Sequence, residues 1–324
     1  MILKMRILVT GGAGFIGSNF ILYTLARYPR YKIINLDQLT YAGNLENLKT
    51  ISRNKNYQFV KGDICDRGLA YRHMSRCDCV VHFAAETHVD RSIKQAGRFV
   101  TTNVYGTFAL LEAALKNKIK RFVHVSTDEV YGSRQKGFFK ESDPLNPSSP
   151  YSASKASSDL LARSYFVTHG LPVLITRSSN NFGPRQYPEK VIPLFITNLL
   201  EGKKAPLYAK GQNIRDWIFV EDNCRAIDLV LHQGKSGEIY NIAGENYRTN
   251  IDLTKTILAN MGQPRSMIEY VADRPGHDFR YAIDCSKIRK LGFKPQVAFE
   301  RALLLTIQWY VQNKTWWKKL KRKS

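Results

Sequence analysis

A glycine-rich turn between a short apolar strand and a helix constrains the fold of this chain more than any other feature. The β-branched run Arg6–Thr10 is followed by Gly11, Gly14 and Gly17, and a helical pattern extends over Gly14–Arg27. Gly11 permits a tight turn, Gly14 lets a phosphate approach the backbone, and Gly17 lets the helix pack closely on the strand. The helix N-terminus offers free N–H groups to that phosphate. In this context the motif predicts a dinucleotide-binding unit.

The first 180 residues continue to alternate short strand patterns with longer helical ones. Further strands are expected at Lys32–Leu36, Tyr57–Lys61, Cys79–Ala84, Arg121–Ser126 and Val173–Arg177. Long helices are expected at Arg98–Lys116 and Ser152–His169. This alternation predicts an α/β fold, a doubly wound parallel sheet of the Rossmann type with helices on both faces. Ligands of such sheets bind beyond the carboxyl ends of the strands.

The sequence changes character after about Asn180, where prolines and polar turns multiply and the elements become shorter. We expect residues 1–180 to form the dinucleotide-binding domain, and residues 181–324 to form mainly a smaller C-terminal substrate-binding lobe. The segment 217–243 is expected to return to the larger domain. The last segment, 314–324, is a basic tail.

The chain is strongly basic, with a formal net charge of +22 over 324 residues. Such a charge attracts phosphate-bearing substrates, nucleic acids or anionic membranes. The basic tail surrounds Trp316 and Trp317, and it is expected to be solvated and frayed. Alternatively, it docks on an anionic surface through basic and aromatic side chains. The sequence contains no run of 18 apolar residues, so we expect no membrane span. The first strand begins too early for a secretory signal peptide, so we expect a cytoplasmic protein.

The cysteines and histidines do not suggest a metal site. The five cysteines are scattered without a CxxC pair, and Cys77-x-Cys79 leads directly into an apolar strand pattern. The seven histidines have no metal-ligand spacing. We therefore expect structural thiols and no bound metal.

An acid at the end of the second strand indicates which dinucleotide is bound. Asp37 lies about twenty residues beyond Gly17, where a carboxylate accepts hydrogen bonds from the adenosine ribose hydroxyls. The same charge would repel the extra phosphate of NADP, and no arginine follows immediately to bind that phosphate. NAD is therefore the expected cofactor, and Asp63, just after the third strand, is placed to meet its adenine.

A tyrosine and a lysine near the start of a predicted helix suggest proton transfer. Tyr151 and Lys155 stand at positions i and i+4, so they share one helix face. The pKa of a free tyrosine is about 10. Lys155 and a positive nicotinamide ring could lower the pKa of Tyr151 to about 7. Tyr151 could then accept a proton from a sugar hydroxyl while a hydride leaves for NAD.

Two adjacent acids, Asp128 and Glu129, follow Thr127 at the end of the fifth strand. Neighbouring residues of a regular strand point to opposite faces, so both acids reach one substrate only if the strand has ended. The turn-forming pair Tyr131 and Gly132 favours such an ending. Because nearby carboxylates repel, one tends to keep its proton while the other ionises. Such a pair supplies the acid and the base that an elimination of water needs.

Together these motifs identify the chain as a member of the extended short-chain dehydrogenase/reductase superfamily. Within it, the chain resembles the nucleoside-diphosphate-glucose 4,6-dehydratases, most specifically at Ser126–Gly132, which contains the two acids. Other matching stretches are Thr40–Asn44, Ala85–Ser92, Ser179–Pro184, Pro188–Lys190, Arg215–Trp217 and Asp273–Asp278. The resemblance extends from about Arg6 to Trp309, and the basic tail lies outside it.

The resemblance implies a hydro-lyase that acts on a nucleotide-activated glucose, either dTDP-glucose or UDP-glucose. Oxidation of C4 to a ketone makes the C5 proton acidic, and the C6 hydroxyl then leaves as water. Hydride return to C6 regenerates tightly bound NAD and gives a 4-keto-6-deoxy sugar. In the family Asp128 would be the acid, Glu129 the base, and Thr127 a hydrogen-bond partner of O4. With Tyr151 and Lys155, these are the expected catalytic residues.

The resemblance also implies the ligand contacts. The expected NAD contacts are Gly11, Gly14, Phe15, Ile16, Gly17, Asp37, Gln38, Leu39, Thr40, Gly43, Asp63, Ile64, Phe83, Ala84, Ala85, Thr102, Tyr151 and Lys155. The expected substrate contacts are Thr87, Thr127, Asn180, Lys190, Val191, Pro206, Tyr208, Arg215, Asn250, Arg274 and His277. Lys190, Arg215 and Arg274 would bind the diphosphate as cations. Asn250 also fits an N-cap for a helix over Ile251–Asn260, and both interpretations stay open.

Two departures from the family pattern concern the nucleotide end of the substrate. Ala209 and Lys210 occupy positions where glycine and an acid are usual, and Phe279 stands where a basic residue is common. The choice between thymine and uracil therefore stays open. Family members pair through two long helices per subunit, here Arg98–Lys116 and Ser152–His169, so we expect a homodimer.

Two other functions remain possible on the sequence alone. A nucleotide-sugar epimerase or decarboxylase of the same superfamily would need Tyr151 and NAD, but no acid–base pair at C5 and C6. A non-catalytic NAD-dependent binding or regulatory protein would use the basic surface, and it would have no need of Tyr151 or Lys155. Nucleic acid is not an expected partner.

Overall fold

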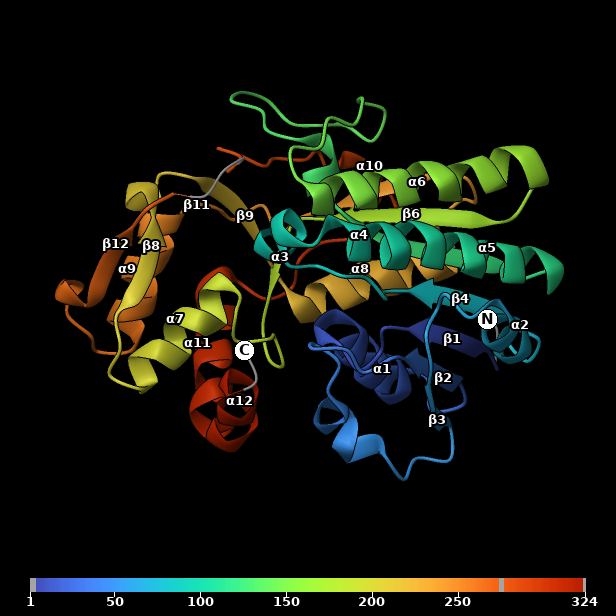
Figure 1. The fold of residues 1–324 in the computed structure, drawn as a ribbon, viewed down its shortest axis with the longest axis horizontal. Helices are drawn as coiled ribbons and strands as arrows, with labels where there is room; N and C mark the ends of the chain where they lie inside the picture. Colours follow the sequence, from blue (N-terminus) through green and yellow to red (C-terminus); the bar gives the residue numbers. More distant parts are fainter. Residues whose placement is uncertain (1–3, 274–276, 323–324) are drawn as a thin grey trace.

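A seven-stranded parallel sheet forms the centre of the larger part of the molecule (Figure 1). The computed structural model describes residues 4–273 and 277–322. The strands lie in the order β10-β6-β5-β4-β1-β2-β3, and each neighbouring pair is parallel. Their bounds are β1 (Arg6–Thr10), β2 (Lys32–Asp37), β3 (Tyr57–Lys61), β4 (Cys79–His82), β5 (Arg121–Thr127), β6 (Val173–Ser178) and β10 (Ile239–Ile242). The predicted α/β doubly wound fold is confirmed.

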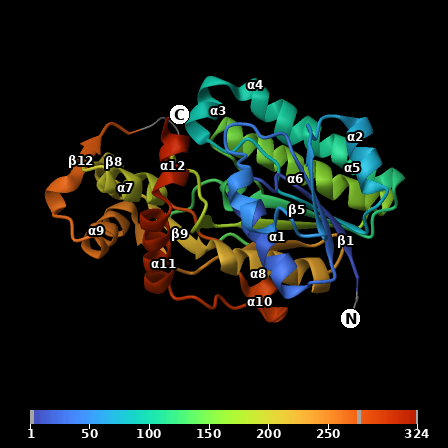
Figure 2. The same cartoon turned by 90° about the horizontal axis from the view of Figure 1, so that it is seen from below.

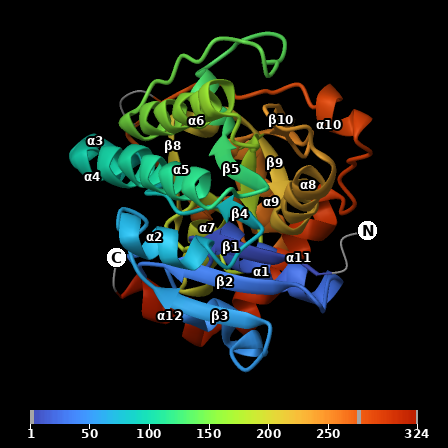
Figure 3. The ribbon, with the colours of Figure 1, turned by 90° about the vertical axis from the view of Figure 1, so that its right-hand side faces the viewer.

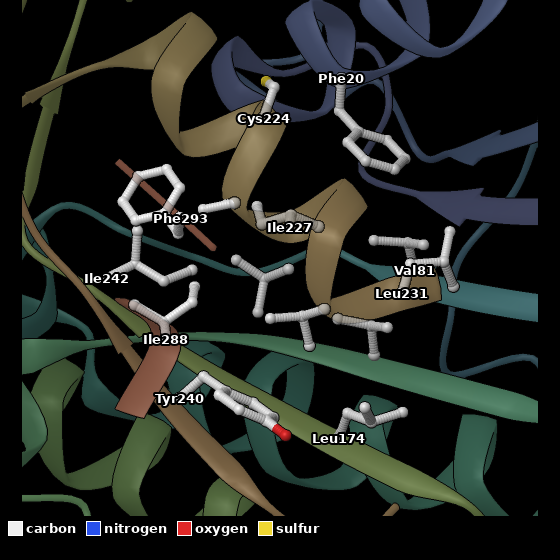
Figure 4. Close-up of a cluster of buried hydrophobic side chains, with 14 of the residues drawn as sticks. Phe20, Val81, Leu174, Cys224, Ile227, Leu231, Tyr240, Ile242, Ile288 and Phe293 are labelled. Atoms are coloured by element: carbon white, nitrogen blue, oxygen red, sulfur yellow. The ribbon is translucent and has the colours of Figure 1, made fainter. Parts of the chain in front are cut away.

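Helices cover both faces of this sheet because the strands are apolar on both faces. The helices are α1 (Phe15–Arg27), α2 (Arg67–Met74), α3 (Val89–Lys94), α4 (Ala96–Phe99), α5 (Gly106–Lys116), α6 (Pro150–His169), α8 (Val220–Gln233) and α10 (Ser286–Lys290). Ile7 and Val9 of β1 belong to the core under α1 and α8, whereas Leu8 belongs to the core under α2, α5 and α6. Figure 3 shows the sheet between these two groups of helices. Figure 4 shows part of the first core, with Phe20, Ile227 and Leu231 above the strands.

The predicted strands match the observed ones to within two residues at either end. The largest difference is at β4, which ends at His82 instead of Ala84. The predicted helix Arg98–Lys116 is less regular than expected. It begins as α4, passes through a π-helical turn over Val100–Tyr105 and continues as α5. The helix α6 begins two residues before the predicted start, because Ser149 and Ser152 form a capping box around Pro150.

The second part of the molecule is smaller and has its own core. A small sheet has the order β11 (Tyr247–Thr249), β9 (Ile214–Phe219) and β7 (Asn180–Phe182), and β8 (Ala205–Tyr208) pairs with β12 (Ile268–Val271). The helices here are α7 (Val191–Leu200), α9 (Asn250–Asn260), α11 (Phe299–Gln312) and α12 (Lys314–Lys321). Their shared core contains Phe182, Phe195 and Tyr310. The chain returns to the large sheet through α8 and β10, which pairs with β6.

The C-terminal segment is a packed helix, so the expectation of a solvated, frayed tail is wrong for residues 314–322. Trp317 and Leu320 share one face of α12 and are buried in the core of the smaller part. The Trp317 indole N–H donates to the carbonyl of Tyr310 over 2.8 Å. Lys318 and Lys319 point to solvent. Lys318 and Lys319 thus belong to the outer face of an amphipathic helix.

Burial of Trp317 leads to a prediction about stability. Trp317→Ala is expected to lower the free energy of unfolding by about 3–5 kcal/mol, because it leaves a cavity in the core. Lys319→Ala, on the exposed face of the same helix, should change it by about 0.5 kcal/mol or less. Urea unfolding of the two variants measures both values. Equal effects of the two substitutions would contradict a packed C-terminal helix.

Candidate active site

A single large cleft contains both the glycine-rich turn and the two adjacent acids. It lies at the carboxyl ends of β1, β4 and β5, where the strand order changes direction along the chain. It encloses about 1700 Å³ of space, its open mouth included.

The cleft brings most of the predicted residues together. All five predicted catalytic residues line it. So do all the predicted NAD contacts except Leu39, together with Thr87, Asn180 and Lys190 of the predicted substrate contacts. The predicted substrate contacts that do not line the cleft are Val191, Pro206, Tyr208, Arg215, Asn250 and His277. Arg274 lies outside the described residues.

The backbone of the glycine-rich turn is fixed by close contacts. Gly11 has φ +69°, and a Cβ there would lie 2.5 Å from the backbone nitrogen of Ala84. A Cβ on Gly17 would lie 2.4 Å from the carbonyl oxygen of Gly11. Both positions therefore require glycine. Gly14 precedes α1 and supplies no side-chain cap, so the helix N-terminus faces the cleft with its backbone N–H groups.

Asp37 is tied to the glycine-rich turn. Its carboxylate accepts hydrogen bonds from the backbone N–H of Ala13 over 2.9 Å and of Leu39 over 2.8 Å. Burial raises the pKa of Asp37, and these two bonds partly oppose that rise. Asp63 accepts a hydrogen bond from Gln38 over 3.0 Å on the same side of the cleft. The two acids therefore hold the loop after β2 in place.

Tyr151 and Lys155 extend from the first turns of α6 toward the end of β5. The Lys155 ammonium donates to the carbonyl of Val125 over 2.9 Å, and the Tyr151 hydroxyl hydrogen-bonds the Thr127 side chain. Burial lowers the pKa of Lys155 to about 8. Burial, with the charges of Glu129 and Asp128, raises the pKa of Tyr151 well above its ordinary value. The protein groups alone therefore favour the neutral phenol, and the expected decrease of its pKa to about 7 beside a positive nicotinamide ring stays a prediction.

The strand β5 ends at Thr127, and this ending brings both acids to the cleft. A 3₁₀ turn over Asp128–Tyr131 follows at once, and the Thr127 hydroxyl accepts a hydrogen bond from the backbone N–H of Glu129 over 3.2 Å. Asp128 and Glu129 both line the cleft, as the argument from strand ending predicted. Gly132 has φ +78° and lets the chain leave the turn.

Asp128 is placed to hold a proton. Its side chain is buried, and its Oδ1 accepts a hydrogen bond from the Thr127 hydroxyl over 3.3 Å. Its Oδ2 has no hydrogen-bond partner among residues 4–273 and 277–322. Burial, followed by the charges of Glu129 and Asp216, raises the pKa of Asp128 well above its ordinary value. Asp128 is therefore the member of the pair whose surroundings favour the protonated form.

A buried ion-pair network behind Lys155 was missed at the sequence level. Asp159, one helical turn after Lys155, pairs with Arg177 over 2.8 Å and with His124 over 3.2 Å. Burial alone would raise the pKa of Asp159, but the charge of Arg177 and the His124 hydrogen bond lower it to about 2. Its negative charge in turn partly opposes the lowering of the pKa of Lys155. The i+4 spacing from Lys155 is the sequence signal that could have revealed it.

Contacts across the cleft connect the two parts of the molecule. Tyr41 donates to Glu189 over 3.1 Å, and Arg91 forms an ion pair with the same carboxylate over 3.3 Å. The Lys190 ammonium donates to the carbonyl of Thr87 over 3.1 Å. Tyr41 and Glu189 line the cleft but were not among the predicted residues.

The remaining predicted substrate residues have other local roles. The Arg215 guanidinium is buried, donates to the carbonyls of Asp278 over 2.8 Å and Phe279 over 3.2 Å, and stacks on Tyr281. His277 pairs with Asp273 over 2.6 Å. The alternative interpretation of Asn250 as an N-cap is wrong, because the side chain of the preceding Thr249 caps α9. Val191, Pro206 and Tyr208 lie outside the wall of the cleft.

Other features of the described part of the chain concern metals, membranes and thiols. Within residues 4–273 and 277–322, no three His, Cys, Asp or Glu side chains form a group suited to a metal ion. No helix in the same ranges has the length and apolar character that a membrane span requires. All five cysteines are free thiols.

Comparisons with known proteins agree with this geometry. The family model described as GDP-mannose 4,6 dehydratase matches residues 8–305. The dTDP-glucose 4,6-dehydratase of Streptomyces niveus is 53% identical over 98% of this chain and 96% of the relative. That of Neisseria meningitidis serogroup B is 50% identical over 96% of this chain and 95% of the relative. The likeness to the first of these reaches beyond Trp309 into α12, so the expectation that the tail lies outside the resemblance is wrong.

Solved structures give the same result. The dTDP-glucose 4,6-dehydratase DesIV of Streptomyces venezuelae, crystallised with NAD, has a TM-score of 0.96 and 53% identity over 98% of this chain and 100% of that chain. A UDP-glucose 4-epimerase of Thermotoga maritima has a TM-score of 0.89 but 31% identity, over 96% of this chain and 100% of that chain. The fold and the cleft thus define a nucleotide-sugar-modifying enzyme of the extended short-chain dehydrogenase type.

The chain belongs to the GDP-mannose 4,6-dehydratase family. Its relatives at 50–53% identity are dTDP-glucose 4,6-dehydratases, and the resemblance predicted from the motifs is confirmed.

The burial of Asp128 gives a prediction about pH and stability. Near pH 4, close to the ordinary Asp pKa of about 3.9, the unfolded carboxyl is only about half ionised and the folded one is protonated, so Asp128→Asn should have little effect. At higher pH the unfolded carboxyl ionises while the buried one keeps its proton, since its folded pKa is raised. The variant should then gain about 1.4 kcal/mol over the wild type for each pH unit, up to the folded pKa. Urea unfolding at about pH 4 and about pH 7 measures the difference, and a pH-independent difference would contradict a protonated Asp128.

Proposed function

We propose that this protein is a dTDP-glucose 4,6-dehydratase, an NAD-dependent hydro-lyase that produces the 4-keto-6-deoxy sugar. One observation carries the proposal. A single cleft joins the glycine-rich turn to Tyr151 and to the adjacent acids Asp128 and Glu129. The named relatives at 50–53% identity support the same activity and the same nucleotide. An epimerase with the same fold would require the tyrosine and NAD, but it would not require two adjacent acids beside the tyrosine.

The cleft fits NAD. Its glycine-rich turn leaves an open helix N-terminus for the diphosphate, and Asp37 is placed for a ribose. The other proposed contacts are the residues expected from the sequence, which line the cleft except for Leu39. When bound, NAD supplies the hydride acceptor and donor and a positive ring near Tyr151. Because the cycle returns the cofactor to its starting state, we propose that NAD stays tightly bound.

Tyr151 is the proposed base for the first proton. Its phenol is held by Thr127, and the Lys155 ammonium, held by the carbonyl of Val125, contributes positive charge close to the end of β5. The buried phenol resists ionisation, so proton removal from the C4 hydroxyl depends on a positive charge brought into the cleft. Thr127 would hydrogen-bond the sugar O4.

Asp128 and Glu129 are proposed to carry out the elimination. Glu129 removes the proton from C5, which the neighbouring C4 ketone makes acidic. The C6–O bond breaks, and the proton of Asp128 joins the departing hydroxyl to give water. The raised pKa of Asp128 supplies that proton near neutral pH.

The nucleotide end of the substrate is proposed to lie toward the smaller part of the molecule. Thr87, Asn180 and Lys190 already line the cleft. The remaining proposed contacts are Val191, Pro206, Tyr208, Arg215, Asn250, Arg274 and His277. Lys190, Arg215 and Arg274 would pair with the diphosphate. In this proposal residues 1–180 and 217–243 bind NAD, and the rest of 181–324 mainly binds the sugar nucleotide.

Substitutions at the acids and the tyrosine test the chemistry. Asp128→Asn and Glu129→Gln should lower turnover about 100-fold or more while NAD stays bound, because each removes one proton-transfer group. Tyr151→Phe should block even the first reduction of bound NAD, which absorbance of NADH reports in single-turnover mixing. A Glu129→Gln variant with wild-type turnover would contradict the assignment of the base.

Mass spectrometry distinguishes the proposed reaction from its alternatives. Incubation with dTDP-glucose should give a product that has lost one water, and UDP-glucose should react more slowly. An epimerase would give a product of unchanged mass. An unchanged mass with both sugar nucleotides would rule out the dehydratase.

We infer that the protein acts as a homodimer. The residues Ala153, Ser157, Leu160, Ser164 and Val167 form one exposed stripe along α6. On this stripe Leu160 is 56% exposed and Val167 is 71% exposed, and Val100 and Tyr105, in the helical segment next to α6, are exposed as well. Small and apolar side chains in such a stripe suit helix packing against a second copy.

A charge on this stripe tests the dimer. The double variant Leu160→Lys with Val167→Lys should sediment as a monomer, because it places cations in an apolar contact. Val311→Lys replaces an exposed apolar residue of α11 and serves as the matched control. A wild-type protein that sediments as a monomer would contradict the inference.

The proposed compartment is the cytoplasm. The free state of all five cysteines supports it, because a reducing compartment keeps thiols from pairing.

A further inference from the structure

The helix α12 reaches from the smaller part of the molecule to the cleft. Figures 1 and 2 show it beside α11 and facing the N-terminal part of the large sheet. Trp317 is buried in the core, but the neighbouring Trp316 lines the cleft together with Leu320. The reaction proposed above assigns no role to either of these cleft-lining side chains.

Trp316 contacts the glycine-rich turn through one intermediate residue. Its indole N–H donates to Oδ1 of Asn47 over 2.9 Å. The amide nitrogen of the Asn47 side chain donates in turn to the carbonyl of Ala13 over 3.0 Å. Ala13 lies inside the turn, and its own N–H is held by Asp37. The Ala13 carbonyl also accepts from the backbone N–H of Asn44 over 3.0 Å. Both polar groups of the Ala13 peptide backbone are therefore held, and Trp316 orients one of the two donors to the carbonyl, the Asn47 amide.

The outer end of this chain of contacts is firmly held. Trp316 packs edge-on against Trp309, with 4.8 Å between ring centroids. Lys321 donates to Asn198 over 2.8 Å and forms an ion pair with Glu201 over 2.9 Å. Tyr310, next to Trp316, donates to the carbonyl of Gln186, which also lines the cleft. The core of the smaller part thus fixes the position of the indole.

The geometry points to Trp316 as a positioning residue for the dinucleotide site. We propose that Trp316, acting through Asn47, holds the glycine-rich turn in its diphosphate-binding form, and that α12 closes this end of the cleft over the bound dinucleotide. The inference rests on the proposed function, in which NAD remains bound through both half-reactions. A contact that joins the two parts of the molecule must break before this end of the cleft opens, so it slows the loss of the dinucleotide.

Trp316→Phe tests the proposal because it removes the indole donor and keeps an aromatic ring. The variant should release NAD about five-fold faster than the wild type, as expected for the loss of one buried hydrogen bond. Trp309→Phe, the same change at the neighbouring tryptophan that does not line the cleft, is the matched control and should release NAD at the wild-type rate.

A double-variant cycle tests the route through Asn47. Asn47→Ala should also speed NAD release, and adding Trp316→Phe to it should have no further effect, because the route is already broken. Independent effects of the two changes, or wild-type NAD release by Trp316→Phe, would overturn the inference and leave the proposed function intact. A wild-type protein that binds no NAD would overturn both.

Discussion

The hydroxyl group of Thr127 occupies the point where the parts of the proposed active site meet. It receives the backbone N–H of Glu129, donates to Asp128 and hydrogen-bonds Tyr151. These contacts exist because β5 stops at Thr127 and the chain enters a 3₁₀ turn. Had the strand continued by two residues, its alternation would have sent one of the acids to the opposite face of the sheet. The termination of one strand thus decides whether the cleft holds an acid and a base together.

Burial gives this site its chemical character at some cost in stability. Asp128 and Lys155 are both removed from water. Burial raises the pKa of Asp128 and lowers that of Lys155, so it favours the neutral form of each side chain. Behind Lys155, Asp159 remains ionised, because the charge of Arg177 and the His124 hydrogen bond lower its pKa to about 2, whereas burial lowers the pKa of His124. A positive ligand ring would therefore enter a cleft in which the tyrosine is neutral and the acid carries its proton. The site is prepared for proton transfer but depends on the cofactor to begin it.

Much of the fold could be predicted from sequence, for physical reasons that particular residues show. The strands of the large sheet are short apolar runs because helices cover both faces, and Gly11 and Gly17 leave no room for a Cβ. Asp128 and Glu129 are adjacent in sequence, so a single turn after β5 is enough to bring both side chains to the cleft. The predicted residues that line the cleft come mostly from strand ends, whose positions the parallel topology fixes.

The remaining features depend on long-range packing that local patterns do not encode. The π-helical turn at Val100–Tyr105 has no composition signal of its own. In the C-terminal segment, Trp317 and Leu320 stand among lysines, and only the tertiary contact with Tyr310 shows that they are buried. The burial of Tyr151, which raises its pKa, likewise depends on packing that the spacing of Tyr151 and Lys155 does not encode.

The path of one hydrogen atom tests the proposed elimination most directly. With dTDP-glucose that carries deuterium at C4, nuclear magnetic resonance of the product locates the label. We predict deuterium at C6 and a solvent-derived hydrogen at C5, since Glu129 would exchange the C5 proton while the cofactor would hold the C4 hydrogen. Deuterium that stays at C4, or a C5 hydrogen that never exchanges with solvent, would contradict elimination by the two adjacent acids.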